Sequence, residues 1–522
     1  MAVPCWDASK GVPGGWSEIG GKMSLRFIGF AHFFGFALSL ILATNSVKGQ
    51  TVIYVDDDHI SDPAPGNPAI SNPMEDGTIE RPFDGIQEAI DFAEEGDLVL
   101  LQDGTYTGQE NRNLTFRGKG ITVRGEHGAA GCVVDCEQAS RGFVFEQGEG
   151  LDSVLEGVTI RNGLLFSDGA FGAGIMILSS SPTIRECVVE DCIAAGLQTA
   201  GGGVYCDGSE AWLDHCVIRN NQVTGFFGRG GGVFLMASSP VISDCVISGN
   251  QSSGIGGGMH LDFESEPNVF RTRIHGNFAL FLGGAASCQS LSHARFQSCV
   301  ISENQSSGTA GISCDQSSPR IHNTLFVGNR STQSTSGVLD CFSGANPVVT
   351  NCTVVNNEDS TGIGCFGGAP IMRSCVITGD GDDLLNCTAR YSFIGDGDSG
   401  EGNVTGDPVF VGPDDFRLQS LSPCINVGDF AFVPGPGEPD LDGHSRVICG
   451  RVDMGAYEFG IGDHDCDRRL TLSDFTGWEE CRTGPDFGEI GDGCEAFDFN
   501  ADLDVDLIDF ADYANLLTSE EP

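Results

Sequence analysis

Short runs of alternating apolar and polar residues, separated by Gly, Asn and Ser, fill most of the chain. The stretch VISDCVISGNQSSGIGGGMHLD, residues 241–262, is typical, and related stretches recur along the sequence. Alternation with a period of two predicts β-strands, because successive side chains of a strand point to opposite faces. The repeated stretches have no helical periodicity, which excludes the helical repeat folds.

The related stretches repeat at intervals of 23 to 29 residues when they are aligned on one position. That position is occupied by Cys187, Cys216, Cys245, Thr272, Cys299, Thr324, Cys352 and Cys375. Five positions later, six of the eight copies have asparagine: Asn221, Asn250, Asn277, Asn304, Asn329 and Asn357. A unit of this length with two or three short strands predicts one coil of a parallel β-helix, in which equivalent inward residues form columns along the axis.

Each column has a packing role. We expect the aligned cysteines to lie inside the strands, and the asparagines to sit at tight left-handed bends with amides bonded along the axis. A second cysteine column follows the glycine runs, at Cys206, Cys288, Cys314, Cys341 and Cys365. Met236 and Leu261 replace cysteine in two copies, and no Cys-x-x-Cys pair occurs in the repeats, so buried thiols are favoured over zinc ligands.

The two ends of the repeat region have their own patterns. After Pro82, residues Phe83, Ile86, Ala89 and Ile90 share one face of a predicted capping helix, and 98–101 is a buried strand. Residues 75–108, with DDFRLQSLSPCINVGD (414–429) and DLDGHSRVICGRVDMGAYEF (440–459), resemble the entry and closing coils of the right-handed parallel β-helix proteins of the pectin-lyase-like superfamily.

The resemblance covers residues 75–459 and implies an all-β solenoid. It makes polysaccharide lyases and hydrolases the activities to weigh, although fold alone does not give function. Cys424 and Cys449 lie in the closing motifs, outside the two columns, and we predict a disulfide between them.

The net charge of the chain limits the classes of partner that it can bind. The chain has 73 acidic and 27 basic residues and a formal net charge of −46, which argues against nucleic acid as a partner. The balance suits an extracellular or cation-binding protein.

The N-terminus resembles an export signal. Arg26 precedes an apolar stretch, and Val47-Lys48-Gly49 gives a cleavage-site pattern, so residues 1–49 are predicted to be a signal peptide whose true start is Met23. The alternative is a membrane anchor, but the apolar run is short for a span. We expect a secreted or cell-surface protein with no transmembrane anchor in the mature chain.

The acidic tail contains two twelve-residue segments with matching spacing, DHDCDRRLTLSD (463–474) and DFNADLDVDLID (498–509). Oxygen donors at loop positions 1, 3, 5, 7 and 12 predict two calcium sites. The expected ligands are Asp463, Asp465, Asp467, Arg469 through its carbonyl, and Asp474, then Asp498, Asn500, Asp502, Asp504 through its carbonyl, and Asp509. The alternative is a solvated acidic tail.

The paired loops resemble the dockerin family of small α-helical, EF-hand-like modules, which implies calcium as cofactor and a cohesin-like protein as partner. The departure is at position 6, where Arg468 and Leu503 replace the usual glycine, which strains the turn. The linker between the loops holds Cys481 and Cys494, a plausible local disulfide.

An active site is not evident. The last lysine is Lys119, so lysine-dependent lyase chemistry is excluded in the repeats. Arg271 and Arg273 could hold a carboxylate, and Asp380, Asp382 and Asp383 lack the Arg-x-Lys partner of the related hydrolases. The sequence leans against an enzyme without excluding one.

The expected organisation has five parts: a signal peptide (1–49), an N-terminal cap and first coil (50–110), β-helix repeats (111–410), closing coils (411–460) and a dockerin-like calcium module (461–522). The favoured function is binding of an extracellular polysaccharide or surface polymer, with calcium-dependent docking. The alternatives are a polysaccharide lyase or glycoside hydrolase, and a structural spacer or adhesin.

Overall fold

A computed structural model of the chain describes residues 49–59, 73–333, 336–357, 361–435, 438–471, 473–483, 490–491, 494–500 and 502–519. The predicted export signal therefore lies, apart from Gly49, outside the described residues. Within those ranges, no helix is both long enough and apolar enough to cross a membrane. Residues Gln50–Pro522 belong to one compact unit.

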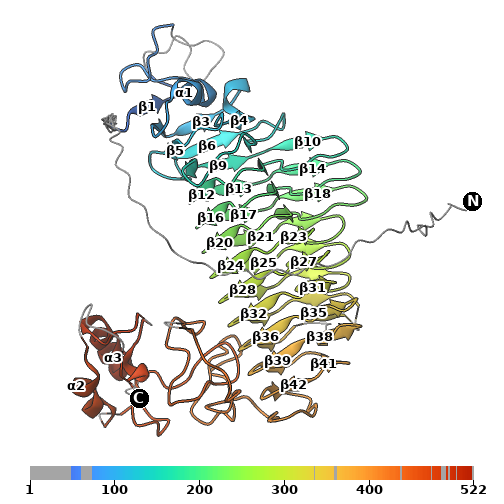
Figure 1. The fold of residues 1–522 in the computed structure, drawn as a ribbon, viewed down its shortest axis with the longest axis vertical. Coiled ribbons are helices and arrows are strands. Elements are labelled where there is room, and N and C mark those ends of the chain that lie inside the picture. Colours follow the sequence, from blue (N-terminus) through green and yellow to red (C-terminus); the bar gives the residue numbers. More distant parts are fainter. Residues whose placement is uncertain are drawn as a thin grey trace, which may run out of the picture. The chain divides into compact units, whose positions relative to one another are not determined.

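Successive short strands wind into stacked coils and form four parallel sheets (Figure 1). Sheet 1 has 13 strands: β1 (Val52–Val55), β2 (Leu98–Leu101), β5 (Thr122–Gly125), β8 (Val154–Glu156), β12 (Thr183–Arg185), β16 (Trp212–Asp214), β20 (Val241–Ser243), β24 (Asn268–Phe270), β28 (Arg295–Gln297), β32 (Arg320–His322), β36 (Val348–Thr350), β39 (Ile371–Arg373) and β42 (Ala389–Arg390).

Sheet 2 has 12 strands: β3 (Gly104–Tyr106), β6 (Cys132–Asp135), β9 (Thr159–Arg161), β13 (Val188–Glu190), β17 (Val217–Arg219), β21 (Val246–Ser248), β25 (Arg273–His275), β29 (Val300–Ser302), β33 (Leu325–Val327), β37 (Thr353–Val355), β40 (Val376–Thr378) and β43 (Phe393–Ile394).

Sheet 3 has 11 strands: β4 (Leu114–Thr115), β7 (Phe143–Phe145), β11 (Ile175–Leu178), β15 (Val204–Asp207), β19 (Val233–Met236), β23 (Met259–Asp262), β27 (Ala286–Cys288), β31 (Ile312–Asp315), β35 (Gly337–Phe342), β38 (Thr361–Phe366) and β41 (Leu384–Leu385). Sheet 4 has seven: β10 (Leu164–Phe166), β14 (Ile193–Ala195), β18 (Gln222–Thr224), β22 (Gln251–Ser252), β26 (Phe278–Ala279), β30 (Gln305–Ser306) and β34 (Arg330–Ser331).

The predicted parallel β-helix is confirmed, and its core is continuous along the coils. Equivalent inward residues pair in register: Ile218 of β17 pairs with Ile247 of β21, which pairs with Ile274 of β25. The expectation of two or three strands a coil was too low for the middle coils, which have four. The fourth strands are only two or three residues long, too short for alternation to reveal.

The aligned cysteines lie in bends rather than inside strands, which corrects the sequence prediction. Each follows a residue with positive φ in the bend between sheets 1 and 2; His215, with φ 50°, precedes Cys216. The cysteines are nevertheless buried in the core, as expected. A compact thiol fills the corner where the chain turns and where a longer side chain would not fit.

The asparagine column forms a ladder of hydrogen bonds along the axis. Each amide Nδ2 donates to the Oδ1 of the next coil, at 3.0 Å from Asn221 to Asn250 and 2.9 Å from Asn277 to Asn304. The same Oδ1 accepts the backbone N–H of the preceding rung, as Asn250 Oδ1 does from Asn221. The predicted amide stacking is confirmed, but the left-handed residue is the one before it, as at Asn220.

A capping helix closes the N-terminal end. Helix α1 (Ile86–Phe92) buries Ile86, Ala89 and Ile90, the face that the sequence pattern indicated. A 3-10 helix, η1 (Gln109–Asn111), follows it, and Asn111 Oδ1 accepts the N–H of Ile86 at 2.8 Å.

The residues after β43 add no further strands to the sheets within the described ranges. They fold back over the outer face of sheet 2, where Phe416 packs with Leu325 and Val355, and Leu441 and Tyr457 pack beside them. The Thr353 hydroxyl of β37 accepts a hydrogen bond from the backbone N–H of Ala456 at 3.0 Å. Residues 411–459 thus cover an outer face, and we call them the covering segment.

The tail has its own small core. Its helical elements are η2 (Asp474–Gly477), α2 (Trp478–Cys481), η3 (Glu495–Phe497) and α3 (Leu507–Ser519). Trp478, Phe497, Val505 and Tyr513 are buried together. Cys481 is bonded to Cys494 beside them.

Candidate functional site

A groove of about 920 Å³ lies where the covering segment ends against the β-helix. Its β-helix wall comes from β24, β25 and β28 and the bends between them, including Phe270, Arg271, Arg273 and Arg295. Its other wall is the covering segment, with Asp440, Leu441, Asp442 and Tyr457. The size is typical of a ligand site, and apolar walls with a few charged groups are the usual composition.

The three arginines give the groove its charge. Arg271 is paired with Asp244 at 2.6 Å and lies over the ring of Phe270. Arg273 and Arg295 are exposed, and no ion pair involves them within the described part of the chain. Two exposed guanidinium groups in one groove favour an anionic ligand, although the chain has a net charge of −46.

Two acidic groups, Asp440 and Asp442, lie on the opposite wall. Asp440 already accepts hydrogen bonds from the N–H groups of Asp442, His444 and Glu458. Burial raises the pKa of Asp442, which stands 4.0 Å from Arg417. Burial beside Asp442 also raises the pKa of Tyr457 above its ordinary value, so its phenol stays protonated and is a donor rather than a base.

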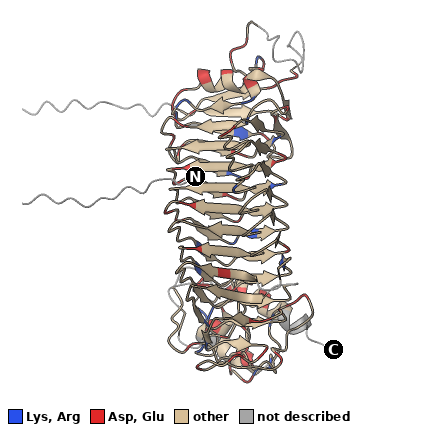
Figure 2. Cartoon of the chain, turned by 90° about the vertical axis from the view of Figure 1, so that its right-hand side faces the viewer, with Lys and Arg blue, Asp and Glu red and all other residues tan. Residues whose placement is uncertain are grey.

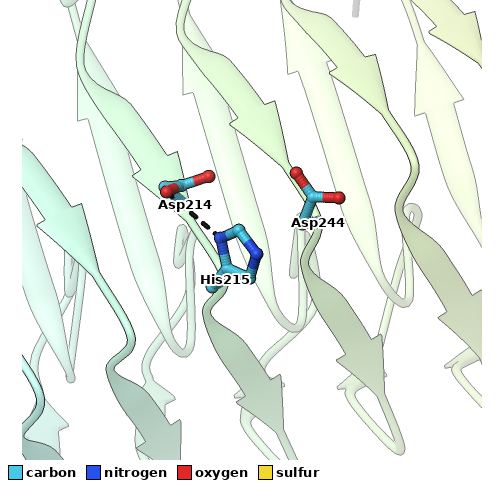
Figure 3. Close-up of side chains that lie close together, drawn as sticks. All are labelled: Asp214, His215 and Asp244. Atoms are coloured by element: carbon cyan, nitrogen blue, oxygen red, sulfur yellow. Dashed lines mark ion pairs between the residues drawn. The ribbon is translucent and has the colours of Figure 1, made fainter. Parts of the chain in front are cut away.

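A charged bend between sheets 1 and 2, formed by Asp214, His215 and Asp244, lies in the two coils that precede Arg271 (Figure 3). His215 Nδ1 lies 3.1 Å from Asp214 Oδ2, and this hydrogen bond raises the pKa of the imidazole. Asp214 Oδ1 accepts from Ser243, whose Oγ accepts from the indole of Trp212. Asp244 faces the pair, and its hydrogen bonds from Arg271 lower its pKa.

The first predicted calcium loop brings most of its acids together. Oxygen atoms of Asp463, Asp465 and Asp474 lie within 4.8 Å of one another. Asp463 Oδ1 accepts the N–H of Asp467, and Asp463 Oδ2 accepts the N–H of Arg468 at 2.8 Å. Burial, with the charge of Asp474 as a further cause, raises the pKa of Asp463.

The second loop repeats these bonds residue for residue. Asp498 accepts from the N–H groups of Asp502 and Leu503, and Asp509 accepts from Phe499 and Asp506 at 2.8 Å. Burial raises the pKa of Asp498 to about 6, with Asp509 and Asp502 as neighbouring charges. Closely set carboxylate oxygens, among which Asp463, Asp498 and Asp509 have pKa values raised by burial, form a donor set that suits calcium.

Two features depart from the predicted ligand set. In the second loop carboxylate oxygens of Asp504, Asp506 and Asp509 lie within 4.8 Å of one another, so the side chain of Asp506 joins the group and Asp504 joins it through its carboxylate rather than its carbonyl. Position 6 is left-handed in both loops, with φ of 68° at Arg468 and 70° at Leu503. The backbone has therefore the shape that the missing glycines normally provide.

Within the described residues, neither Asp467 nor Asn500 belongs to the clusters of carboxylate oxygens given above. Asn500 donates from Nδ2 to Asp502 at 2.8 Å, and the N–H of Asp467 donates to Asp465 at 3.2 Å. Within the described residues, the carbonyl of Arg469, predicted at position 7, accepts no hydrogen bond, and its side chain lines a hollow beside the tail.

The disulfide expected between Cys424 and Cys449 is wrong. Cys449 is bonded to Cys466, which lies in the first of the two predicted calcium loops, and Cys424 is a free, buried thiol. Cys365, assigned to the thiol column, is bonded to Cys387. Folding back of the chain brings these partners together, and motif position does not reveal it.

Sequence reasoning missed most of the groove. It singled out Arg271 and Arg273 from their shared strand pattern but not Arg295, which lies in the next coil of sheet 1. Asp440, Leu441 and Tyr457 are far away in sequence and meet the arginines only because the covering segment folds back. No signal in the sequence gives that contact.

Comparison with known proteins agrees with the fold. The family described as "Right handed beta helix region" matches residues 197–339. Among solved structures, pectate lyase Pel9A is similar at 15% identity, covering 78% of this chain and 97% of that one with a TM-score of 0.44. A rhamnogalacturonan lyase is similar at 12% identity, covering 60% and 84%, with a TM-score of 0.42.

The A-module of the mannuronan C-5 epimerase AlgE6 of Azotobacter vinelandii is 13% identical over 62% of this chain and 94% of that one, with a TM-score of 0.33. The search of curated proteins found no match. Similarity this low does not bear on the activity of the present chain.

Proposed function

We propose that the protein is exported and binds an acidic extracellular polysaccharide in the groove between β24, β25, β28 and the covering segment. The observation that carries the proposal is the pair of exposed guanidinium groups, Arg273 and Arg295, on one wall of a 920 Å³ groove. Guanidinium groups bind carboxylates and sulfates through paired N–H donors. The apolar wall around Phe270 and Leu441 offers surface to the C–H faces of sugar rings.

Binding is favoured over cleavage by the chemistry of the same groups. Arginine stays protonated in proteins and does not serve readily as a base. Tyr457 has a pKa raised by burial, and the groove contains no histidine or lysine. The groove therefore has donors for a uronate carboxylate. Its described groups that could remove a proton are the carboxylates of Asp440, which already accepts three N–H groups, and Asp442, which stands 4.0 Å from Arg417.

The test is affinity electrophoresis of the chain from residue 50 in gels that contain polygalacturonate, alginate or a neutral galactomannan. We expect the acidic polymers to retard the protein and salt to weaken the effect. Arg273→Gln and Arg295→Gln should each weaken binding about tenfold, from the ~1.5 kcal/mol of a charge-assisted hydrogen bond. Arg219→Gln is the matched control, because Arg219 is exposed on β17 but paired with Glu190 outside the groove.

Equal mobility in the presence and absence of both acidic polymers would reject this function. Loss of binding in Arg219→Gln as large as in Arg273→Gln would show that total charge, not the groove, is responsible.

For residues 461–522 we propose a dockerin-like module that binds two calcium ions and docks to a cohesin-like protein. The matching hydrogen bonds around Asp463 and Asp498, and the left-handed turns at Arg468 and Leu503, support it. Bound calcium would neutralise the carboxylates and hold both loops against the core around Trp478.

Calorimetry of the chain from residue 50 tests this module. Two calcium ions should bind, and Asp463→Asn with Asp498→Asn in one variant should abolish both events. Asp407→Asn, a change to an exposed acid outside the tail, should alter neither. Absence of binding heat at millimolar calcium would leave the tail as a solvated acidic segment.

A second candidate function is glycoside hydrolysis at the charged bend. Oxygens of Asp214 and Asp244 and a ring nitrogen of His215 lie within 4.8 Å of one another, and a pair of close carboxylates is the arrangement of retaining glycosidases. If it holds, reducing ends should appear from one of the three polymers above, and Asp244→Asn should stop their release. No release from any polymer would dismiss this candidate.

A further inference from the structure

A second pocket lies on a different side of the β-helix, on the outer face of sheet 3. Its volume is about 360 Å³, and its walls include Phe171, Tyr205, Phe227, Phe234 and Phe263, with Arg229 and Asp262 at one end. We call it the aromatic pocket. The segments that cover sheet 3 on this side pair from coil to coil at Phe171, Ala200, Arg229, Ile255 and Leu282.

Its surroundings carry little charge. The side that bears sheet 4 faces the viewer in Figure 2 and shows few acidic or basic residues. The loop sequences QVTGFFG (222–228) and FALFL (278–282) contain none. A ligand on this side is therefore not drawn in by electrostatic attraction, in contrast to the arginine groove.

Aromatic rings form the floor and the rim. Phe171 and Tyr205 stack at a centroid distance of 4.9 Å, and Tyr205 and Phe234 at 5.3 Å. The floor of the pocket is therefore a stack of aromatic rings that spans three coils. Phe227 and Phe263 stand at the rim, 55% and 59% exposed. Such large exposed apolar side chains around a hollow mark a binding site more often than a free surface.

The polar end of the pocket is electrically neutral. Arg229 Nη1 lies 2.9 Å from Asp262 Oδ2, and the side chain of Asp262 is only 4% exposed. His260 lies behind it, fully buried and stacked on Phe234, and neither of its ring nitrogens makes a hydrogen bond. His260 Nε2 is 3.9 Å from Asp262 Oδ2, too far for one.

These features restrict the ligand. A free anion would meet an arginine already neutralised by Asp262, and a free cation would meet a carboxylate already neutralised by Arg229. A purely apolar molecule would cover the ion pair and remove its water without replacement, which is costly. A ligand with an apolar face and several hydroxyl groups satisfies both ends, because adjacent hydroxyls can accept from the guanidinium and donate to the carboxylate.

We propose that the aromatic pocket binds an uncharged sugar residue, stacked on the rim rings Phe227 and Phe263, with its hydroxyl groups bonded to Arg229 and Asp262. The site is separate from the arginine groove and does not depend on the function proposed for it. The protein thus has one site for an acidic sugar and another for a neutral one, on different faces of the β-helix.

The experiment is affinity electrophoresis of the chain from residue 50 in gels with soluble neutral polysaccharides: dextran, galactomannan, xyloglucan and arabinogalactan. At least one should retard the protein, and Phe227→Ala should weaken that binding about fivefold, the size expected for one aromatic contact. Phe166→Ala is the matched control, because Phe166 is 86% exposed on the same side but outside the pocket.

A charge-changing variant gives a second readout. Asp262→Asn keeps the shape of the side chain but leaves Arg229 without its counter-ion, so binding should shift from the neutral polymer toward polygalacturonate. That shift should persist when Arg273→Gln weakens binding in the groove.

The proposal is overturned if no neutral polysaccharide retards the protein, or if Phe166→Ala weakens binding as much as Phe227→Ala. Failure of the function proposed for the arginine groove would give a different result. The unsubstituted chain would then still bind a neutral polymer but would not bind polygalacturonate.

Discussion

At the scale of single residues, Asp380 is the exception in the asparagine ladder. Its Oδ1 accepts the N–H and the Nδ2 of Asn357, as the next asparagine would, but its Oδ2 is buried without a hydrogen bond. Burial raises the pKa of Asp380 to about 7, with Asp383 as the nearby like charge. The folded protein therefore holds a proton there that the unfolded chain releases near pH 4.

The sign of the pH effect follows from linkage. Between about pH 4 and pH 7 the folded state binds more protons than the unfolded state at this residue, so the free energy of unfolding falls as the pH rises through that window. Asp380→Asn restores an ordinary rung and should raise stability at pH 8 by about 1–3 kcal/mol, while changing little at pH 4. Urea unfolding at the two pH values measures this, and equal shifts at both would contradict it.

Leu503, in the second proposed calcium loop, has a backbone conformation that is unusual for its residue type, because it is a branched residue with φ 70°. Such a conformation costs roughly 1–2 kcal/mol for a residue other than glycine. Leu503→Gly should therefore tighten calcium binding at the second loop about fivefold, and Leu503→Asn should give an intermediate gain. Calorimetric titration measures the two affinities, and weaker binding by the glycine variant would show that the leucine side chain, not its backbone, sets the affinity.

At the scale of elements, the asparagine ladder joins each coil to the next. Asn277 accepts from two donors of Asn250 and donates to Ile247 O and Asn304 Oδ1. Asn277→Ala leaves several buried groups unpaired and should lower stability by about 2–4 kcal/mol. Asn268→Ala, on the exposed side of β24, should change it by less than about 0.5 kcal/mol. Thermal unfolding followed by circular dichroism compares the two variants.

The elements also show how far the sequence reaches. The asparagine ladder, the inward columns and the buried face of α1 could be predicted from residue patterns. The first two repeat once in each coil, and the third has the periodicity of an α-helix. Sheet 4 could not, since a strand such as Gln251–Ser252 is too short to alternate. The Cys449–Cys466 bond and the wall around Tyr457 could not either, because both arise where the covering segment and tail return to the β-helix.

At the scale of the whole molecule, the cysteines divide into two populations. The described chain has three disulfides and fourteen free thiols, all of the latter buried. Burial raises the pKa of Cys299 to about 12, so little of it is thiolate at neutral pH. The native chain from residue 50 should therefore react with almost no Ellman reagent, and the unfolded, unreduced chain with about fourteen equivalents. A count near sixteen would indicate that one of the three disulfides is absent.

The asparagine ladder also implies that one whole coil can be removed or added without changing the hydrogen bonds between the remaining coils. Excising residues 222–250 would join Asn221 directly to Gln251, and the spacing of 29 residues between Asn221 and Asn250 is that of one full turn of the chain. Asn277 would then meet Asn221 in the place of Asn250, with the same donors and acceptors facing one another. A family of longer and shorter versions could arise by gain or loss of whole turns, each leaving the joint between its neighbours intact.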